Sequence, residues 1–336
     1  MTVLDLSTNN LDAVPAEFGR LTALKTLDLD NNLLTDLPTE FSGLSNLTQL
    51  TFAHNKLDIF PECLCQLMFM QQLDLHSNQL SSIPDNVSRL DSLQKLNLND
   101  NNFSVFPEAL ASIRFLIELD MSENKMHKVP GSISRLGELA VLNFAKNQLT
   151  TLPPEIGEMT VLMNLNLSNN QLTTLPPELG RLTYLSKLIV PGNKLTVLPT
   201  ELSSITFLEE FDVSFNKIKD FPSELCKLEK MKHLKLSSNC LPCLPQELGA
   251  LFRLNELVVA NNMISELPDS VVKLTRLQSL TIFGNQLTRL PAGIETLKHV
   301  EMLSLGDNLL DEEGLAPLCS EVHTFTFSLS LLFHIF

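Results

Sequence analysis

Residues 149–157 read Leu-Thr-Thr-Leu-Pro-Pro-Glu-Ile-Gly, and apolar residues follow at 159, 162, 165 and 167 before Asn170. The same pattern recurs along the chain with an asparagine at every twenty-third position. These asparagines are Asn9, Asn32, Asn55, Asn78, Asn101, Asn124, Asn147, Asn170, Asn193, Asn216, Asn239, Asn262, Asn285 and Asn308. Equal intervals without insertion or deletion indicate a chain built from one repeated structural unit.

Each position of the repeat has a physical task. The two leucines before each asparagine, such as Leu165 and Leu167, alternate with period two and predict a short strand with one buried face. A proline six residues after the asparagine ends the strand and fixes φ for the next turn. An acidic residue soon after this proline and a basic residue three positions later suit the dipole of a short helical turn. Because an asparagine side chain both donates and accepts, we expect it to satisfy backbone groups of its own coil and of the next one.

This repeat resembles the leucine-rich repeat in its 23-residue Leu-Pro-x-x-Ile-Gly form, as at 152–157. It is similar to the intracellular Ras-group scaffolds and to the Scribble and Erbin type. The resemblance covers residues 2 to about 318 and implies an α/β fold. That fold is a leucine-rich-repeat solenoid, or horseshoe, with a concave parallel sheet and short turns or helical turns on its convex side. It also implies protein recognition as the usual work, without indicating a particular partner.

The repeat predicts one leucine-rich-repeat domain of about fourteen repeats over residues 1–318. The last repeat lacks the proline, and its sequence from Asn308 to Leu315 favours a longer, helix-bearing unit. Residues 319–336 form an atypical apolar tail that fits no position of the repeat. We interpret this tail either as a truncation or splice boundary or as an apolar plug over the last coil.

Composition narrows the function classes. The 336 residues include 39 acidic and 24 basic ones, a formal net charge of -15. This charge predicts no binding to nucleic acid or to an anionic membrane surface. No apolar run reaches the roughly 18 to 20 residues of a membrane-spanning helix. Six scattered cysteines and the lack of a signal-peptide pattern predict a reduced, cytoplasmic protein.

The residue between the two strand leucines is acidic or an amide in most of the first nine repeats. We predict that Asp28, Asp74 and Asp120, with Asp30 and Glu123 beside them, contact a partner. One interpretation is a surface that steers the basic face of a protein partner. The other is that aspartate is a soluble filler at this position.

Apolar residues occupy predicted solvent positions in the later repeats. Ile189, Phe215, Val258 and Phe283 are candidate anchors for the same partner. Pro191 and Ala260 accompany them at positions that should also face solvent. Self-association, or contact with a missing C-terminal segment, would account for the same pattern.

Motifs for catalysis or cofactors are weak in this sequence. His54 and His76 lie near Asp74 and could contribute to a zinc site, but ordinary solvated side chains are favoured. Cys240 and Cys243 have a C-x-x-C spacing without a second pair, which favours a structural role. Phosphate-binding glycine loops and zinc-protease or hydrolase motifs do not occur. We therefore predict no enzyme activity, no cofactor and no metal.

The resulting hypothesis is a non-enzymatic scaffold for protein–protein interaction in intracellular signal transduction. Its partner would have a basic and apolar face, and the family resemblance offers a small GTPase or a phosphatase subunit as candidates. Two alternatives stay open. The chain could be the recognition half of a larger signalling enzyme with a GTPase, kinase, cyclase or ubiquitin-ligase domain, or part of a cortical polarity scaffold.

Overall fold

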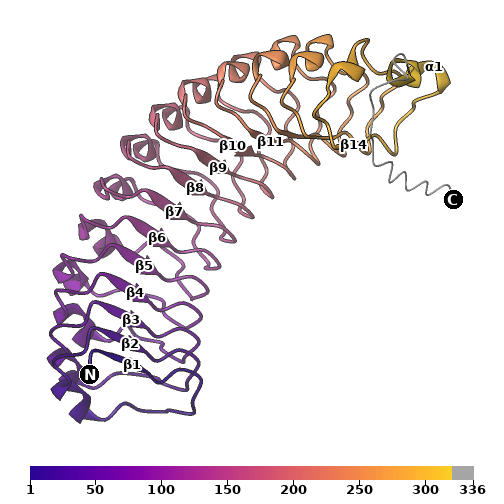
Figure 1. Ribbon diagram of the computed structural model, residues 1–336. Helices are drawn as coiled ribbons and strands as arrows, with labels where there is room; N and C mark the ends of the chain where they lie inside the picture. Colours follow the sequence, from indigo (N-terminus) through magenta and orange to yellow (C-terminus); the bar gives the residue numbers. More distant parts are fainter. Residues whose placement is uncertain (320–336) are drawn as a thin grey trace. The chain divides into compact units, whose positions relative to one another are not determined.

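The computed structural model describes residues 1–319, which form a regular stack of coils (Figure 1). Each coil contains one short strand and, in all but the last, one 3-10 helix between that strand and the next. Within each compact unit of the chain, the helices follow one another in a row along one side of the coils (Figure 1). The apolar tail predicted at 319–336 lies, beyond Cys319, outside the described residues.

The chain divides into two compact units. Unit 1 spans Met1–Lys194 and contains strands β1 to β9, whereas unit 2 begins at Leu195 and contains β10 to β14. Both units repeat the same coil, and the single-domain organisation stays a prediction.

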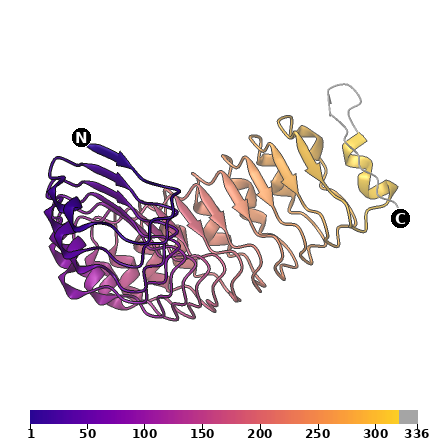
Figure 2. The same ribbon diagram turned by 90° about the horizontal axis from the view of Figure 1, so that it is seen from below.

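Three-residue strands lie parallel, in chain order, within each unit. In unit 1 they are β1 (Val3–Asp5), β2 (Thr26–Asp28), β3 (Gln49–Thr51), β4 (Gln72–Asp74), β5 (Lys95–Asn97), β6 (Glu118–Asp120), β7 (Val141–Asn143), β8 (Asn164–Asn166) and β9 (Lys187–Ile189). In unit 2 they are β10 (Glu210–Asp212), β11 (His233–Lys235), β12 (Glu256–Val258), β13 (Ser279–Thr281) and β14 (Met302–Ser304), which Figure 2 shows with their helices behind them.

The predicted alternation of the strands is confirmed. Leu27 pairs with Leu50 in register, and both side chains are fully buried. The residue between the two leucine positions of each repeat, Asp28 at the end of β2 and Thr51 at the end of β3, is half-buried on the opposite face. We call this face the strand face. We call the residue the strand-centre residue, and its position the strand centre, because it lies midway between these leucine positions. The leucine-rich-repeat solenoid predicted from the sequence is therefore the observed fold.

The predicted helical turns are 3-10 helices of three to five residues, a length at which this tighter helix is common. Pro153 precedes the helix Pro154–Glu158, and the Ile156 N–H donates to the Pro153 carbonyl at 3.1 Å. The helices are Ala16–Arg20, Thr39–Gly43, Glu62–Gln66, Asp85–Arg89, Glu108–Ser112, Gly131–Arg135, Pro154–Glu158, Pro177–Arg181, Thr200–Ser204, Ser223–Lys227, Gln246–Ala250, Asp269–Lys273, Ile294–Thr296 and Ala316–Cys319.

The repeated asparagines link neighbouring coils. The Asn147 Nδ2 donates to the carbonyls of Phe144 and Ala145 in its own coil and to that of Met121 in the preceding coil. Its Oδ1 accepts the N–H of Met126, also in the preceding coil, at 2.9 Å. The expectation that the side chain reaches the next coil was therefore wrong. The next coil's Asn170 already serves this turn, since it binds the Phe144 carbonyl and the Leu149 N–H.

The residue before each repeated asparagine has a positive φ in all fourteen coils, which sequence analysis did not anticipate. Most of these residues are small or polar, and two are glycines, Gly192 and Gly284. Phe215 is the exception, because a bulky aromatic residue is held there at φ 54°. Since this conformation is unfavourable for bulky residues, Phe215 costs the fold stability that a glycine or asparagine would not.

The last described coil ends in the helix that its sequence predicted. Helix α1 spans Glu312–Leu315 and is the α-helix among residues 1–319. The Asp311 side chain caps it by accepting the Gly314 N–H at 2.8 Å. Gly314 packs against the previous coil so closely that a Cβ there would lie 2.2 Å from the Thr288 carbonyl oxygen.

We predict that Asn147→Ala lowers the free energy of unfolding by about 3 kcal/mol, because it leaves a buried N–H and buried carbonyls without partners. Urea denaturation followed by circular dichroism measures the loss. Asn46→Ala is the matched control, since the exposed Asn46 makes one hydrogen bond, to the Thr22 carbonyl. Equal losses for the two variants would contradict this role of the repeated asparagine.

Candidate functional site

The strand face of unit 1 contains a hollow of about 250 Å³ over β3 to β6. It is lined by all three residues of β3, β4 and β5 and by the first and last residues of β6. The lining residues are Gln49, Leu50, Thr51, Gln72, Leu73, Asp74, Lys95, Leu96, Asn97, Glu118 and Asp120. Of the five predicted charge partners, the structure therefore places Asp74 and Asp120 in one hollow.

The strand-centre aspartates also have a structural role that sequence reasoning missed. Asp28, Asp74 and Asp120 each accept the backbone N–H two residues further on, at 2.9, 3.0 and 2.8 Å. Asn97, Asn143 and Asn166 accept the equivalent N–H at 3.1 Å. This shared bond explains why the strand centre is so often an aspartate or an asparagine. The sequence signal was the acceptor common to both residue types.

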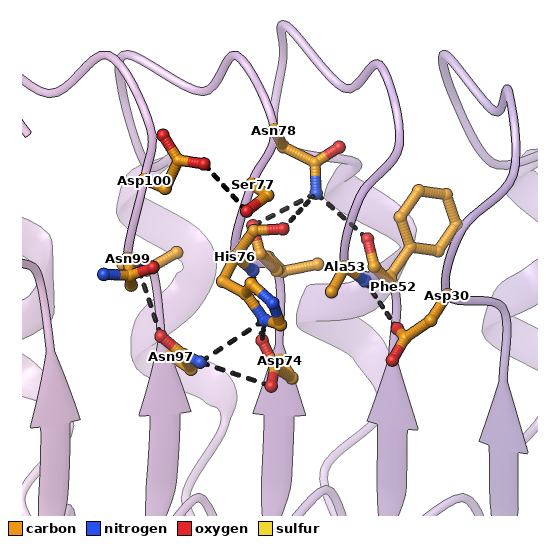
Figure 3. Close-up of polar contacts among 12 residues, drawn as sticks. Asp30, Phe52, Ala53, Asp74, His76, Ser77, Asn78, Asn97, Asn99 and Asp100 are labelled. Atoms are coloured by element: carbon orange, nitrogen blue, oxygen red, sulfur yellow. Dashed lines mark hydrogen bonds and ion pairs between the residues drawn. The ribbon is translucent and has the colours of Figure 1, made fainter. Parts of the chain in front are cut away.

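Asp74 lies at the centre of a polar cluster (Figure 3). Its Oδ1 lies 2.7 Å from the Nδ1 of His76, and its Oδ2 accepts a hydrogen bond from Asn97 at 3.3 Å. The rings of His54 and His76 pack edge to face, with their centroids 4.8 Å apart. Within residues 1–319, no three histidine, cysteine or carboxylate groups converge as a metal site would require.

Asp30 serves the neighbouring coil rather than its own. The centre of β3 is Thr51, which leaves the Ala53 N–H without an aspartate in its own strand, and Asp30 accepts that N–H at 2.6 Å (Figure 3). Burial raises the pKa of the Asp30 carboxyl, and the negative charges of Asp28 and Asp74 act in the same direction. The hydrogen bond from Ala53 partly offsets this rise in the pKa.

Glu123 differs from the other predicted charge partners, because a cation already faces it. Its Oε1 lies 2.9 Å from the Nζ of Lys146 on the next coil. The Oε2 of Glu118 is paired in the same way with Lys95, at 2.9 Å. Exposed pairs of this kind contribute little to stability. By contrast, none of the described lysines or arginines pairs with Asp28, Asp74 or Asp120.

The predicted apolar anchors belong to different units. Ile189 is half-buried at the centre of β9 in unit 1, and Pro191 is half-buried two residues later. In unit 2, Val258 is half-buried at the centre of β12, whereas Phe215 and Phe283 are 64% and 44% exposed. Phe215 is the most exposed of the four anchors.

Ala260 was expected to face solvent but is buried. It occupies the same position of the repeat as Phe283, two residues after the strand centre. The difference follows from length, because a methyl group is too short to project beyond the neighbouring coils whereas a benzyl group does. Among the apolar residues predicted to face solvent in unit 2, the two phenylalanines are therefore exposed, whereas Ala260 is not.

The described cysteines are free thiols. Burial raises the pKa values of Cys65 and Cys226 to about 12, so both are protonated at neutral pH and behave as small apolar residues. In the C-x-x-C pair, Cys240 is half-buried and Cys243 is exposed.

Comparison with known proteins agrees with this architecture. A leucine-rich repeat region model matches residues 220–316, a second leucine-rich repeat model matches 1–57 and 70–126, and a third matches 161–182. A search of curated protein sequences yields no match.

Several solved structures are similar to this chain. The leucine-rich-repeat protein LIC12759 of Leptospira interrogans is 30% identical, with 94% of this chain and 92% of that one covered and a TM-score of 0.68. The plant peptide hormone receptor RGFR1, solved in complex with RGF2, is 30% identical over 92% of this chain, with a TM-score of 0.80. This chain covers 52% of that receptor chain. An internalin of Listeria monocytogenes, 24% identical with 91% and 87% coverage and a TM-score of 0.79, shares the fold.

Stacked parallel strands joined by short 3-10 turns and linked by asparagine side chains define a repeat solenoid. The chain belongs to the leucine-rich-repeat proteins. The leucine-rich-repeat fold is in general a scaffold for protein–protein interaction, and its members are typically non-enzymatic. Among the residues that the structure describes, no helix is long and apolar enough to span a membrane.

We predict that Asp30→Asn stabilises unit 1 at neutral pH. The folded protein holds the Asp30 proton more tightly than the unfolded chain does, so ionisation of wild-type Asp30 lowers stability as the pH rises above its ordinary pKa of 3.8. Asparagine keeps the acceptor for the Ala53 N–H and removes the charge. The difference in unfolding free energy between variant and wild type should grow from pH 4 to pH 7, as urea titrations can measure.

The exposed Asp58 provides the control for this measurement. Asp58→Asn removes the same charge from the exposed surface of the same unit and should change the free energy of unfolding at pH 7 much less than Asp30→Asn does. A stability curve for Asp30→Asn that runs parallel to the wild-type curve would show that burial of Asp30 carries no cost.

Proposed function

We propose that this chain is a non-enzymatic scaffold that binds a protein partner on the strand face of unit 1, within intracellular signal transduction. The observation that carries the proposal is the set of strand-centre carboxylates, Asp28, Asp74 and Asp120, which face no described lysine or arginine. A partner with basic side chains would supply the missing cations. Its approach would be accelerated and oriented by this charge.

The strand face of unit 1 is a preformed site for a polypeptide ligand. The strand centres belong to hydrogen-bonded parallel strands, and their carboxylates are held by backbone N–H groups two residues away. Side chains fixed in this way lose little conformational entropy when a partner binds. The peptide hormone receptor RGFR1, which shares the fold and was solved with RGF2 bound, is consistent with a polypeptide ligand.

The apolar residues extend the proposal. Ile189 of unit 1 would contact apolar side chains of this partner. Phe215, Val258 and Phe283 belong to unit 2 and would contact a protein at that unit, where burial of an aromatic ring contributes most to affinity. By resemblance to the Ras-group scaffolds, a small GTPase or a phosphatase subunit is the proposed class of ligand. We also propose a reduced, cytoplasmic location, since the six cysteines of the sequence are scattered and do not form the pattern of a disulfide framework.

We predict that Asp28→Asn, Asp74→Asn and Asp120→Asn together weaken partner binding about tenfold, since three surface charges of roughly 0.5 kcal/mol each are removed. Asparagine keeps the hydrogen bond to the backbone, as Asn97, Asn143 and Asn166 show, so the coil stays folded. Affinity capture with mass spectrometry identifies the partner, and titration of that purified partner measures the change.

The matched control is the triple variant Glu17→Gln, Glu155→Gln and Glu178→Gln. It removes the same number of charges from the first turns of the 3-10 helices of unit 1. We expect its affinity to equal that of the wild type. If both triple variants bind the partner equally well, or if binding is insensitive to salt, the strand-face carboxylates are not the binding surface.

A further inference from the structure

The backbone N–H two residues after each strand centre distinguishes the last four coils from the others. In eight coils this N–H donates to the aspartate or asparagine at its own strand centre. In the coil of β3, Asp30 of the preceding coil accepts it, and in the coil of β9 the residue is Pro191, which has no N–H. Throughout unit 1, this backbone N–H therefore either has a side-chain acceptor or is replaced by a proline.

In unit 2, the coils after β10 have no side-chain acceptor for this N–H among the described residues. The strand centres of β11 to β14 are Lys235, Val258, Thr281 and Ser304, which lie in register on neighbouring strands. None of them accepts the N–H two residues further on. Within residues 1–319, the N–H groups of Ser237, Ala260, Phe283 and Gly306 have no hydrogen-bond acceptor.

These four donors face the strand face. In the other coils the side chain that reaches the equivalent N–H starts from the strand centre, which lies on that face. A fifth donor belongs to the same row, because the Ser237 hydroxyl is buried without a described partner. The coil of Ser237 has Lys235 at its strand centre, whereas in the coil of β6 the Asp120 carboxylate accepts from both the N–H and the hydroxyl of Ser122.

Two exposed aromatic residues border this row of donors. Phe215 precedes it by one coil, and Phe283 lies within it, 64% and 44% exposed respectively. The Phe283 ring lies over Gly306, where a Cβ would come within 3.1 Å of the ring. Phe215 keeps its exposed ring despite a positive φ, at a position where the other thirteen coils have polar residues or glycine. Strain of this kind is retained more readily where the side chain has a use.

We propose that the strand face of β11 to β14 binds an acidic polypeptide segment of a protein partner. Its Asp or Glu carboxylates would accept hydrogen bonds from the N–H groups of Ser237, Ala260 and Phe283, in the role that the chain's own aspartates have in unit 1. Apolar side chains of the segment would pack on Phe215 and Phe283. No carboxylate occupies the four strand centres, so they do not repel such a ligand, and Lys235 adds a positive charge.

This second surface has the opposite ligand preference from the strand face of unit 1. Two acids adjoin this surface: Glu256 is engaged by Lys235 at 3.6 Å and by His233 at 3.2 Å, and Asp212, in register with Lys235, accepts the Ser214 N–H. The inference stands apart from the function proposed for unit 1, because it rests on backbone donors of unit 2. A variant that changes only one of the two surfaces therefore tests them separately.

The test uses the full chain labelled with ¹⁵N and the capped peptide acetyl-(Leu-Asp)₃-amide as the probe. We expect the peptide to move the amide proton signals of Ser237, Ala260 and Phe283 downfield, as new hydrogen bonds do. Acetyl-(Leu-Lys)₃-amide should leave these signals in place. The variant Asp28→Asn, Asp74→Asn and Asp120→Asn should bind the acidic peptide with unchanged affinity.

The decisive variant is Val258→Asn with Thr281→Asn. Each asparagine supplies the missing acceptor within its own coil, as Asn143 does for the Ala145 N–H, and adds no charge that could repel the peptide. We expect the signals of Ala260 and Phe283 to move downfield without peptide, and the affinity for the acidic peptide to fall about tenfold or more.

Val258→Thr is the matched control, since Thr281 does not accept the Phe283 N–H and a threonine at 258 should not accept that of Ala260. Its affinity should equal that of the wild type. Four results would overturn the proposal: unmoved amide signals, equal binding of the Leu-Lys peptide, sodium acetate alone matching the peptide, or full affinity in the double asparagine variant. Sodium acetate is included because a site for a small anion would respond to it equally.

Discussion

The hydrogen bonds of one asparagine side chain per coil, buried in twelve of the fourteen coils, determine how neighbouring coils are arranged. Asn147, for example, binds three carbonyls and one N–H in two coils at once. Single coils cannot bury their leucines, so the solenoid depends on contacts between neighbours. The asparagine makes such a contact directional. It accepts an N–H of the preceding coil, whereas the equivalent N–H of its own coil donates to the asparagine of the following coil. A fixed length of 23 residues keeps these bonds in register.

A second hydrogen bond links this architecture to recognition. A strand-centre aspartate is both a cap for a backbone N–H and a charge on the strand face, so Asp28 and Asp120 serve structure and surface together. This dual role bears on whether the strand-centre aspartate is a filler or a binding residue. The hydrogen bond explains the oxygen acceptor, and asparagine would provide it equally well. The charge is the part that a partner can select.

Unit 2 lacks this cap in its coils after β10. Lys235, Val258 and Thr281 replace the acceptor and leave backbone donors at the strand face. In the coil of β10, one coil before these donors, the chain also holds the exposed ring of Phe215 in a conformation that suits glycine. An exposed aromatic group beside unpaired donors combines apolar contact area with directional polar groups, a composition typical of binding surfaces. The two units thus present different chemistry on the same repeat.

Patterns within the sequence were sufficient to predict the repeat length, the buried leucines, the turn after each proline and the helix at Glu312–Leu315, because each of these depends on local periodicity or local backbone preference. They also indicated which side chains reach the strand face. The stacking of the coils was needed to show which coil each asparagine serves, that Ala260 is buried, and which N–H groups lack acceptors. Those facts depend on how one coil packs against the next. The sequence pattern of a single coil contains no information about the distances between atoms of neighbouring coils.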